Sequence, residues 1–153
     1  MKNILHLFII TILLISNINC AQSQNKNEQV IEMLKEFYTA YNKAWENIDD
    51  PLTLKNTLVS LQQKYCSEKL QNKLKDFYKM YGLDHDLLLD DVGTDTITLQ
   101  KTLSVTKDLE KDNSYVVSYI ANIEDPDKTL KKKVTIHLTV VNEKDSFKID
   151  QVW

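Results

Sequence analysis

The chain of 153 residues contains no arginine, and its 19 basic residues are all lysine, against 22 acidic ones. Arginine presents a planar fork that suits bidentate recognition of phosphate, which lysine lacks. This absence and the net charge of −3 argue against a nucleic-acid partner. The basic run Lys131-Lys132-Lys133 is interpreted as a solvated strand end.

No apolar run is long enough to span a membrane as a helix. The segment from Ile4 to Ile15 is apolar apart from His6 and Thr11, which is too short for a hydrocarbon core of about 30 Å. Because it follows a short positive start at Lys2, it is typical of an export signal. We predict that residues 1–19 are a signal peptide, which leaves enough chain for one domain.

Cysteine is also scarce, and the position of Cys20 just after the apolar run indicates that this residue belongs to the export signal and its processing. We favour cleavage before Cys20 and attachment of lipid to its sulfur, although Asn19 is a poor residue before a lipidated cysteine. Ordinary signal cleavage after Ala21 and an uncleaved anchor are the alternatives. The favoured hypothesis predicts an exported lipoprotein anchored in the bacterial cell envelope, facing the periplasm or the surface. Cys66 would then be the only thiol without lipid, which permits no internal disulfide.

The first half of the domain has helical periodicity. Residues 20–27 are interpreted as the lipidated cysteine and a polar tether, and residues 28–153 as the domain. Apolar residues recur at helical spacing from Glu28. Asp50 and Pro51 predict the start of a second helix, and Ser67 predicts the cap of a third. Gly82 is expected to end that third helix in a left-handed conformation.

The second half changes to a period of two residues. Strands are predicted over residues 99–107, 115–123, 130–141 and 147–153, separated by polar turns. Short connections predict an antiparallel meander. Helices followed by strands predict an α+β fold in which N-terminal helices pack on a curved antiparallel sheet. Such a sheet forms a cone whose interior is either a filled core or a pocket.

Several segments together resemble the DUF3828 family of small exported bacterial proteins, which belongs to the NTF2-like (cystatin-like) superfamily. They are "IEMLKEFYTAYNKAW", "QQKYCSEKL", the acidic segment that ends at Asp95, and "VTIHLTVVNEKDSFKIDQVW". The resemblance implies the cone-shaped α+β fold and a lipoprotein leader. It implies no activity, because NTF2-like domains include isomerases, dehydratases, binding modules and toxin-neutralising proteins.

An acidic segment between the two glycines is a candidate loop for a partner or a cation. Its candidate residues are Asp84, His85, Asp86, Asp90, Asp91 and Asp95. Clustered carboxylates suit Ca²⁺, but Leu89 occupies the position where the calcium loop of an EF-hand requires glycine. We therefore interpret the segment mainly as a solvated loop, with partner recognition and an irregular calcium site as alternatives.

No catalytic, metal or cofactor motif can be assembled from the remaining residues. His137 is expected on the sheet surface, and Cys66 is expected to be a buried structural thiol. A group of aromatic residues at helical spacing is expected to pack in the core rather than line a ligand cavity: Phe37, Tyr38, Tyr41, Trp45, Phe77 and Tyr78.

These observations favour a non-enzymatic binding module anchored in the envelope. Its ligand would be a small apolar molecule or a protein, and an immunity-type role is one variant. The alternative is an enzyme of the isomerase or dehydratase type that transfers protons in the cone. That alternative requires a carboxylate or histidine facing a cavity.

Overall fold

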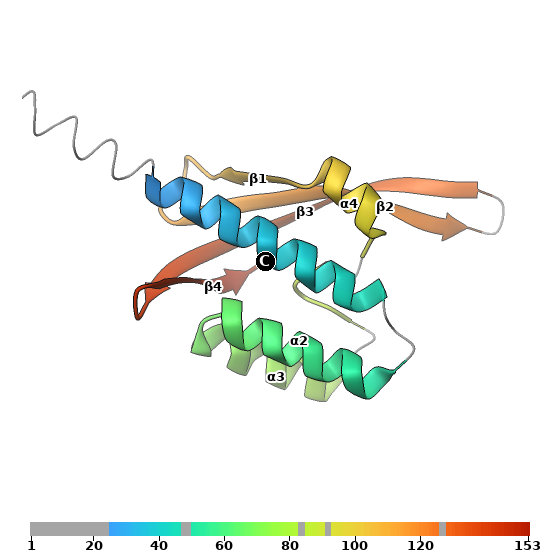
Figure 1. The fold of residues 1–153 in the computed structure, drawn as a ribbon, viewed down its shortest axis with the longest axis horizontal. Helices are drawn as coiled ribbons and strands as arrows, with labels where there is room; N and C mark the ends of the chain where they lie inside the picture. Colours follow the sequence, from blue (N-terminus) through green and yellow to red (C-terminus); the bar gives the residue numbers. More distant parts are fainter. Residues whose placement is uncertain (1–24, 47–49, 83–84, 91–92, 126–127) are drawn as a thin grey trace, which may run out of the picture.

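The computed structural model describes residues 25–46, 50–82, 85–90, 93–125 and 128–153. These residues form an α+β fold of helices on an antiparallel sheet, as predicted (Figure 1). The N-terminal helix (residues 25–46) lies across the sheet. It is followed by α2 (Pro51–Tyr65), α3 (Glu68–Tyr81) and α4 (Thr96–Thr102). The strands are β1 (Ser104–Lys107), β2 (Ser114–Asp125), β3 (Lys128–Glu143) and β4 (Ser146–Val152).

The helix boundaries follow from side chains that satisfy free backbone N–H groups. Asp50 caps α2 by accepting from the Leu52 N–H at 3.0 Å, and Pro51 is its first residue. The Ser67 hydroxyl caps α3 by accepting from the Leu70 N–H at 3.1 Å. These predictions are confirmed. Gly82 ends α3 at φ 69° and ψ −154°, a positive-φ conformation open almost only to glycine, rather than the predicted left-handed helical one.

The sheet is a simple meander with the order β1-β2-β3-β4, all pairs antiparallel. The long β2–β3 hairpin pairs Ser114 with Thr139 at one end and Asp125 with Lys128 at the other. The β3–β4 register shifts between Thr139 and Val140, where β4 contains one extra residue, Asp150. The predicted antiparallel meander is confirmed.

The prediction of one strand over residues 99–107 is wrong for its first half. Thr96–Thr102 form α4, and only Ser104–Lys107 are extended. The β-branched residues of this segment favour a strand, but the Asp95 carboxylate accepts from the Thr98 N–H at 2.9 Å and starts a helix. Thr102 at its end accepts from the Ile120 N–H at 3.1 Å and fixes α4 against β2. A local cap and a tertiary contact thus override the intrinsic preference.

The helix that was predicted from Glu28 already includes residues 25–27. Asn27 accepts a hydrogen bond from the Tyr115 hydroxyl at 3.2 Å, so part of the predicted tether is docked on β2. Among the described helices, none has the length and apolarity that a bilayer crossing requires.

The core lies between the N-terminal helix, the α2–α3 pair and one face of the sheet. Val134, Ile136, Leu138 and Val140 of β3 are buried on this face, as their alternation predicted. The rest of the core comes mainly from β2, β4 and the helices: Leu34, Phe37, Tyr38, Tyr41, Leu58, Leu70, Leu74, Tyr115, Val117, Tyr119, Ala121 and Ile149. The interior is thus a packed core, and the cone is filled.

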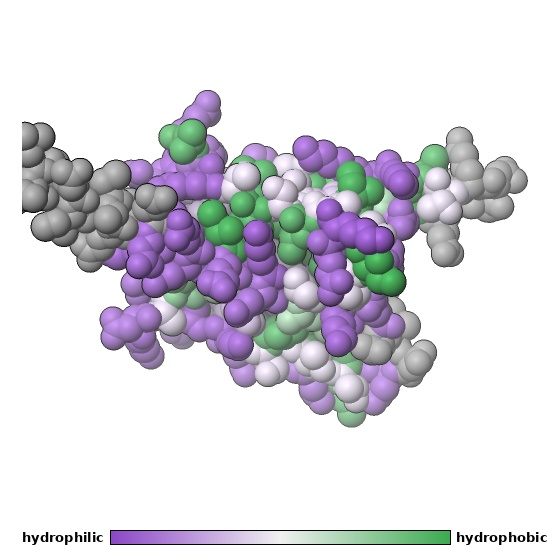
Figure 2. All heavy atoms as spheres, turned by 45° about the horizontal axis from the view of Figure 1, so that its top comes forward, coloured by the Kyte–Doolittle hydropathy of each residue, from purple (hydrophilic) through white to green (hydrophobic). Residues whose placement is uncertain are grey.

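The outer surface is mostly polar in the view of Figure 2, where hydrophobic patches are interrupted by hydrophilic side chains. Large exposed apolar side chains such as Leu109, Ile97 and Met80 come from different elements. Scattered residues of this kind are normal on soluble domains. Lys131–Lys133 are exposed on β3, in agreement with the predicted solvated strand end.

Candidate functional site

The structure gives the described acidic residues of the candidate loop different local partners. Asp86 is buried, with 5% of its surface exposed. Asp90 is exposed, and its carboxylate lies 3.9 Å from the Lys132 ammonium. Asp95 caps α4 and accepts from the Asn122 amide at 3.2 Å. His85 is exposed and makes an edge contact with the Tyr81 ring at 5.8 Å. Asp84 and Asp91 lie outside the described residues, as does Cys20.

Asp86 is the residue around which the end of the N-terminal helix is organised. Its Oδ2 accepts from the Tyr41 hydroxyl at 2.9 Å and from Trp45 Nε1 at 3.2 Å. Its Oδ1 accepts from the backbone N–H groups of Leu88 and Leu89 at 2.8 and 3.2 Å. One carboxylate therefore ties the helix to the segment that follows α3.

Burial governs the ionisation of Asp86. Removal from water disfavours the charged carboxylate and raises its pKa, which outweighs the opposite effect of the hydrogen bonds from Tyr41, Leu88, Leu89 and Trp45. A raised pKa is a property of many catalytic acids. Here, however, five donors occupy both oxygens, since the Tyr78 hydroxyl also donates to Oδ2 at 3.5 Å, and this is the arrangement of a structural tie between segments.

A hydroxyl and amide network connects Asp86 to the surface. The Gln62 Nε2 of α2 donates to the Tyr41 hydroxyl at 3.0 Å and to the Tyr78 hydroxyl at 3.2 Å. The two hydroxyl oxygens are 3.1 Å apart. Burial is the main cause that raises the pKa values of both tyrosines, so they stay protonated at neutral pH and act as neutral hydrogen-bonding groups.

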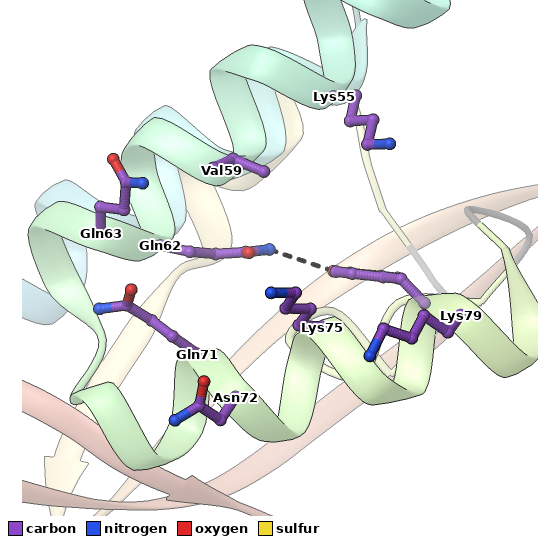
Figure 3. Close-up of a pocket in the computed structure, with 9 residues that line it drawn as sticks. Lys55, Val59, Gln62, Gln63, Gln71, Asn72, Lys75 and Lys79 are labelled. Carbon is purple, nitrogen blue, oxygen red and sulfur yellow. Dashed lines mark hydrogen bonds between the residues drawn. The ribbon is translucent and has the colours of Figure 1, made fainter.

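On the outer side of this network, α2 and α3 border a groove of about 680 Å³ (Figure 3). This α2–α3 groove is lined by three lysines, four side-chain amides, a valine and a tyrosine: Lys55, Val59, Gln62, Gln63, Gln71, Asn72, Lys75, Tyr78 and Lys79. No carboxylate is among these described lining residues. Its volume is within the range of about 300–1,000 Å³ for small-molecule sites. The lysine ammonium groups and the side-chain amides of this lining can bind a ligand through charge and hydrogen bonds.

The sequence did not indicate this groove, because its residues resemble an ordinary solvated helix face. One signal was present. Gln62 follows Leu54 and Leu58 at four-residue steps, which places it in the apolar stripe of α2, and it is buried with 6% of its surface exposed. A polar residue in a buried stripe requires partners and marks a polar network.

The predicted packing role of the aromatic residues is confirmed where they are buried. Phe37 lies within 5.4 Å, ring centre to ring centre, of Tyr38, Tyr41 and Tyr65. Trp45 and Phe77 are half-buried, and Phe77 packs on Tyr81 at 4.8 Å.

Tyr78 belongs to both the packing and the groove. Its ring packs near Phe77 at 6.2 Å between ring centres, and it lines the α2–α3 groove. The prediction that the aromatics pack rather than line a cavity therefore holds for the core but not for Tyr78.

Cys66 and His137 take the positions that were expected from the sequence. The Cys66 thiol is buried, with 1% of its surface exposed, and desolvation raises its pKa to about 12. His137 is half-buried on the outer face of β3 and stacks on Trp153 at 6.3 Å. Within the described part of the chain, no three histidine, cysteine or acidic side chains come together as metal ligands would.

Comparison with known proteins supports the fold. The chain is similar to a crystal structure of a protein of unknown function from Bacteroides thetaiotaomicron, with a TM-score of 0.71 and 25% sequence identity. The match covers 90% of this chain and 98% of the other. A designed β-sheet protein solved by NMR matches at a TM-score of 0.45 and 17% identity, covering 82% and 87% of the two chains. No protein-family model matches the chain, and neither does any curated protein.

Proposed function

We propose that this protein is a non-enzymatic binding module whose ligand occupies the α2–α3 groove. One observation carries the proposal: the groove is lined by lysines and amides that bind, whereas the buried carboxylate of Asp86 lies behind Tyr41, Gln62 and Tyr78 with both oxygens engaged. The filled cone supports a groove ligand over a small apolar molecule in the interior. It likewise supports binding over proton transfer of the isomerase or dehydratase type.

The proposal includes the predicted location. A lipid on Cys20 would hold the domain at the envelope membrane, with the groove exposed to the periplasm or the surface. Mass spectrometry of the mature N-terminus tests this part. A diacylated or triacylated Cys20 is the expected species, and Cys20→Ala should release the protein from membranes. An unmodified N-terminus that begins after Cys20 would contradict the anchor without affecting the groove.

A fragment screen by NMR tests the groove itself. The full chain is purified in detergent with ¹⁵N label and titrated with small acidic, basic and neutral fragments at millimolar concentration. We expect the largest shifts at Val59, Gln62 and Asn72, which line the groove. The proposed function would be contradicted if every fragment shifted the signals of residues outside the groove, or if no fragment shifted the signals of these three residues.

A further inference from the structure

We infer that the α2–α3 groove selects a small organic acid that carries a compact apolar group and a hydrogen-bond donor. This inference rests on the proposed function of the groove and adds the chemistry of the ligand. Three features carry it: two lysines that form no ion pair with the described residues, an apolar end, and a free amide acceptor of Gln62 at the wall.

The first feature is a local positive charge in an acidic protein. The net charge of the chain is −3, yet Lys55, Lys75 and Lys79 line the groove and no described lining residue is acidic. The Lys79 ammonium pairs with the Asp76 carboxylate at 2.9 Å. Lys55 and Lys75 form no ion pair with the described residues, and Figure 3 shows both extending into the space between the helices. The two helices thus present a cation each to an incoming anion.

The second feature is an apolar hollow at one end of the groove. It measures about 200 Å³ and is lined by Leu58, Val59, Gly82 and Tyr78, together with Lys55 and Gln62. The larger groove shares four of these residues, so the two spaces adjoin. The hollow is smaller than the sites of about 300 Å³ and above that hold drug-sized ligands. A single ring or a short branched chain is the group that suits it, with Lys55 beside it.

The third feature is the Gln62 side chain, which is 94% buried given its exposure of 6%. The Tyr41 hydroxyl donates to Asp86, so its oxygen accepts from Gln62 Nε2, and this fixes the amide orientation. Gln62 Oε1 makes no hydrogen bond within the described part of the chain, although the residue lines both spaces. Gln62 Oε1 is therefore an accessible acceptor at the wall of the groove, where a ligand hydroxyl or N–H donor can replace water.

A matched set of three probes separates the contribution of the charge from that of the apolar group. The probe 3-phenyllactate has a ring, a hydroxyl and a carboxylate; 3-phenyllactamide lacks the charge, and lactate lacks the ring. Each is titrated into the ¹⁵N-labelled full chain in detergent, and the shifts of Val59, Gln62 and Asn72 are followed. We expect 3-phenyllactate to bind at these residues about 3- to 10-fold more tightly than either analogue. Relative to the amide it gains one charged contact, and relative to lactate it gains the partial burial of its ring.

Variants locate the charge recognition. Lys55→Gln and Lys75→Gln should each weaken 3-phenyllactate about 3- to 10-fold and leave 3-phenyllactamide unchanged. Lys101→Gln is the control, because Lys101 is an exposed lysine on α4 and does not line the groove. The inference would be overturned if the acid and the amide bound with equal affinity, or if neither groove variant changed the affinity for 3-phenyllactate. The groove would still be a binding site in either case. Equal binding of lactate would overturn the apolar component. If no probe and no screened fragment moves the groove residues, the proposed function itself fails.

Discussion

Replacing Asp86 by alanine should destabilise the protein more than the same change at either of the other described acidic residues of the segment, Asp90 and Asp95. The substitution removes the acceptor for five donors, which lie on the N-terminal helix, on α3 and on the segment after α3. Leu88 and Leu89 are buried, with 0% and 3% of their surface exposed, so their N–H groups lose the carboxylate where water is excluded. The end of the N-terminal helix would lose its tie to this segment.

The magnitude follows from the fate of each donor. A buried N–H left without an acceptor costs about 1–3 kcal/mol. The Leu88 N–H becomes such a group after the substitution, whereas the Leu89 N–H keeps its bond to the backbone carbonyl of residue 86 at 3.3 Å. The Tyr41 hydroxyl can turn to Tyr78 at 3.1 Å, and Trp45 is half-buried, so both recover part of their loss. Removing a desolvated charge offsets another part. We therefore expect a net loss of about 1–3 kcal/mol in the free energy of unfolding.

Urea unfolding followed by tryptophan fluorescence measures this loss. Asp90→Asn is the control in the same segment, because Asp90 is exposed, its carboxylate lies 3.9 Å from the Lys132 ammonium, and asparagine tolerates its positive φ of 50°. The control should change stability by no more than about 0.5 kcal/mol. A loss below about 1 kcal/mol for Asp86→Ala would refute the structural role assigned to the carboxylate.

Three further predictions concern pH, a helix cap and a thiol. Burial raises the pKa of Asp86 in the folded state, so the folded protein binds a proton at this residue more tightly than the unfolded chain does. Relative to Asp86→Asn, the wild type should therefore become more stable as the pH falls through that raised pKa toward the unfolded value of about 3.9. Urea titrations from pH 7 to pH 3.5 check this, and a gain in the opposite direction would show that the hydrogen bonds dominate. Ser67→Ala should cost about 1–2 kcal/mol in urea unfolding, because the buried hydroxyl both caps α3 and donates to Asp150 at 2.8 Å; a change below about 0.5 kcal/mol would contradict this. Cys66, with a pKa raised to about 12, should resist a thiol reagent such as DTNB at pH 8 until denaturant is added, and rapid labelling of the folded protein would show that the thiol is accessible.

The elements of the fold were largely predictable where a local signal sets them. Asp50 with Pro51 and Ser67 marked helix starts because a capping side chain acts on N–H groups only two or three residues away. Alternation along β3 predicted its buried face for the same local reason, since successive side chains of a strand point to opposite faces. Residues 99–102 were mispredicted as part of a strand, because the composition of the segment favours a strand while a cap and a contact with β2 favour a helix.

The candidate site was not predictable in the same way. The acidic segment appeared as one unit in the sequence, but its described members differ in burial and partners. Asp86 turns inward because Tyr41 and Trp45, more than forty residues earlier, present donors to it. Lys55 and Lys75 have no local feature that distinguishes them from other surface lysines.

By itself, the sequence determined the α+β class, the order of the strands, most helix boundaries and the prediction of an exported chain. These depend on periodicity, caps and composition, which act over a few residues or over the whole chain. Only the tertiary structure decided that the cone is filled, that Asp86 is buried beneath Tyr41 and Tyr78, and that α2 and α3 border a groove with lysines on both sides. These features depend on packing between segments far apart in the chain, and packing decides which polar side chains leave water and which remain to meet a ligand.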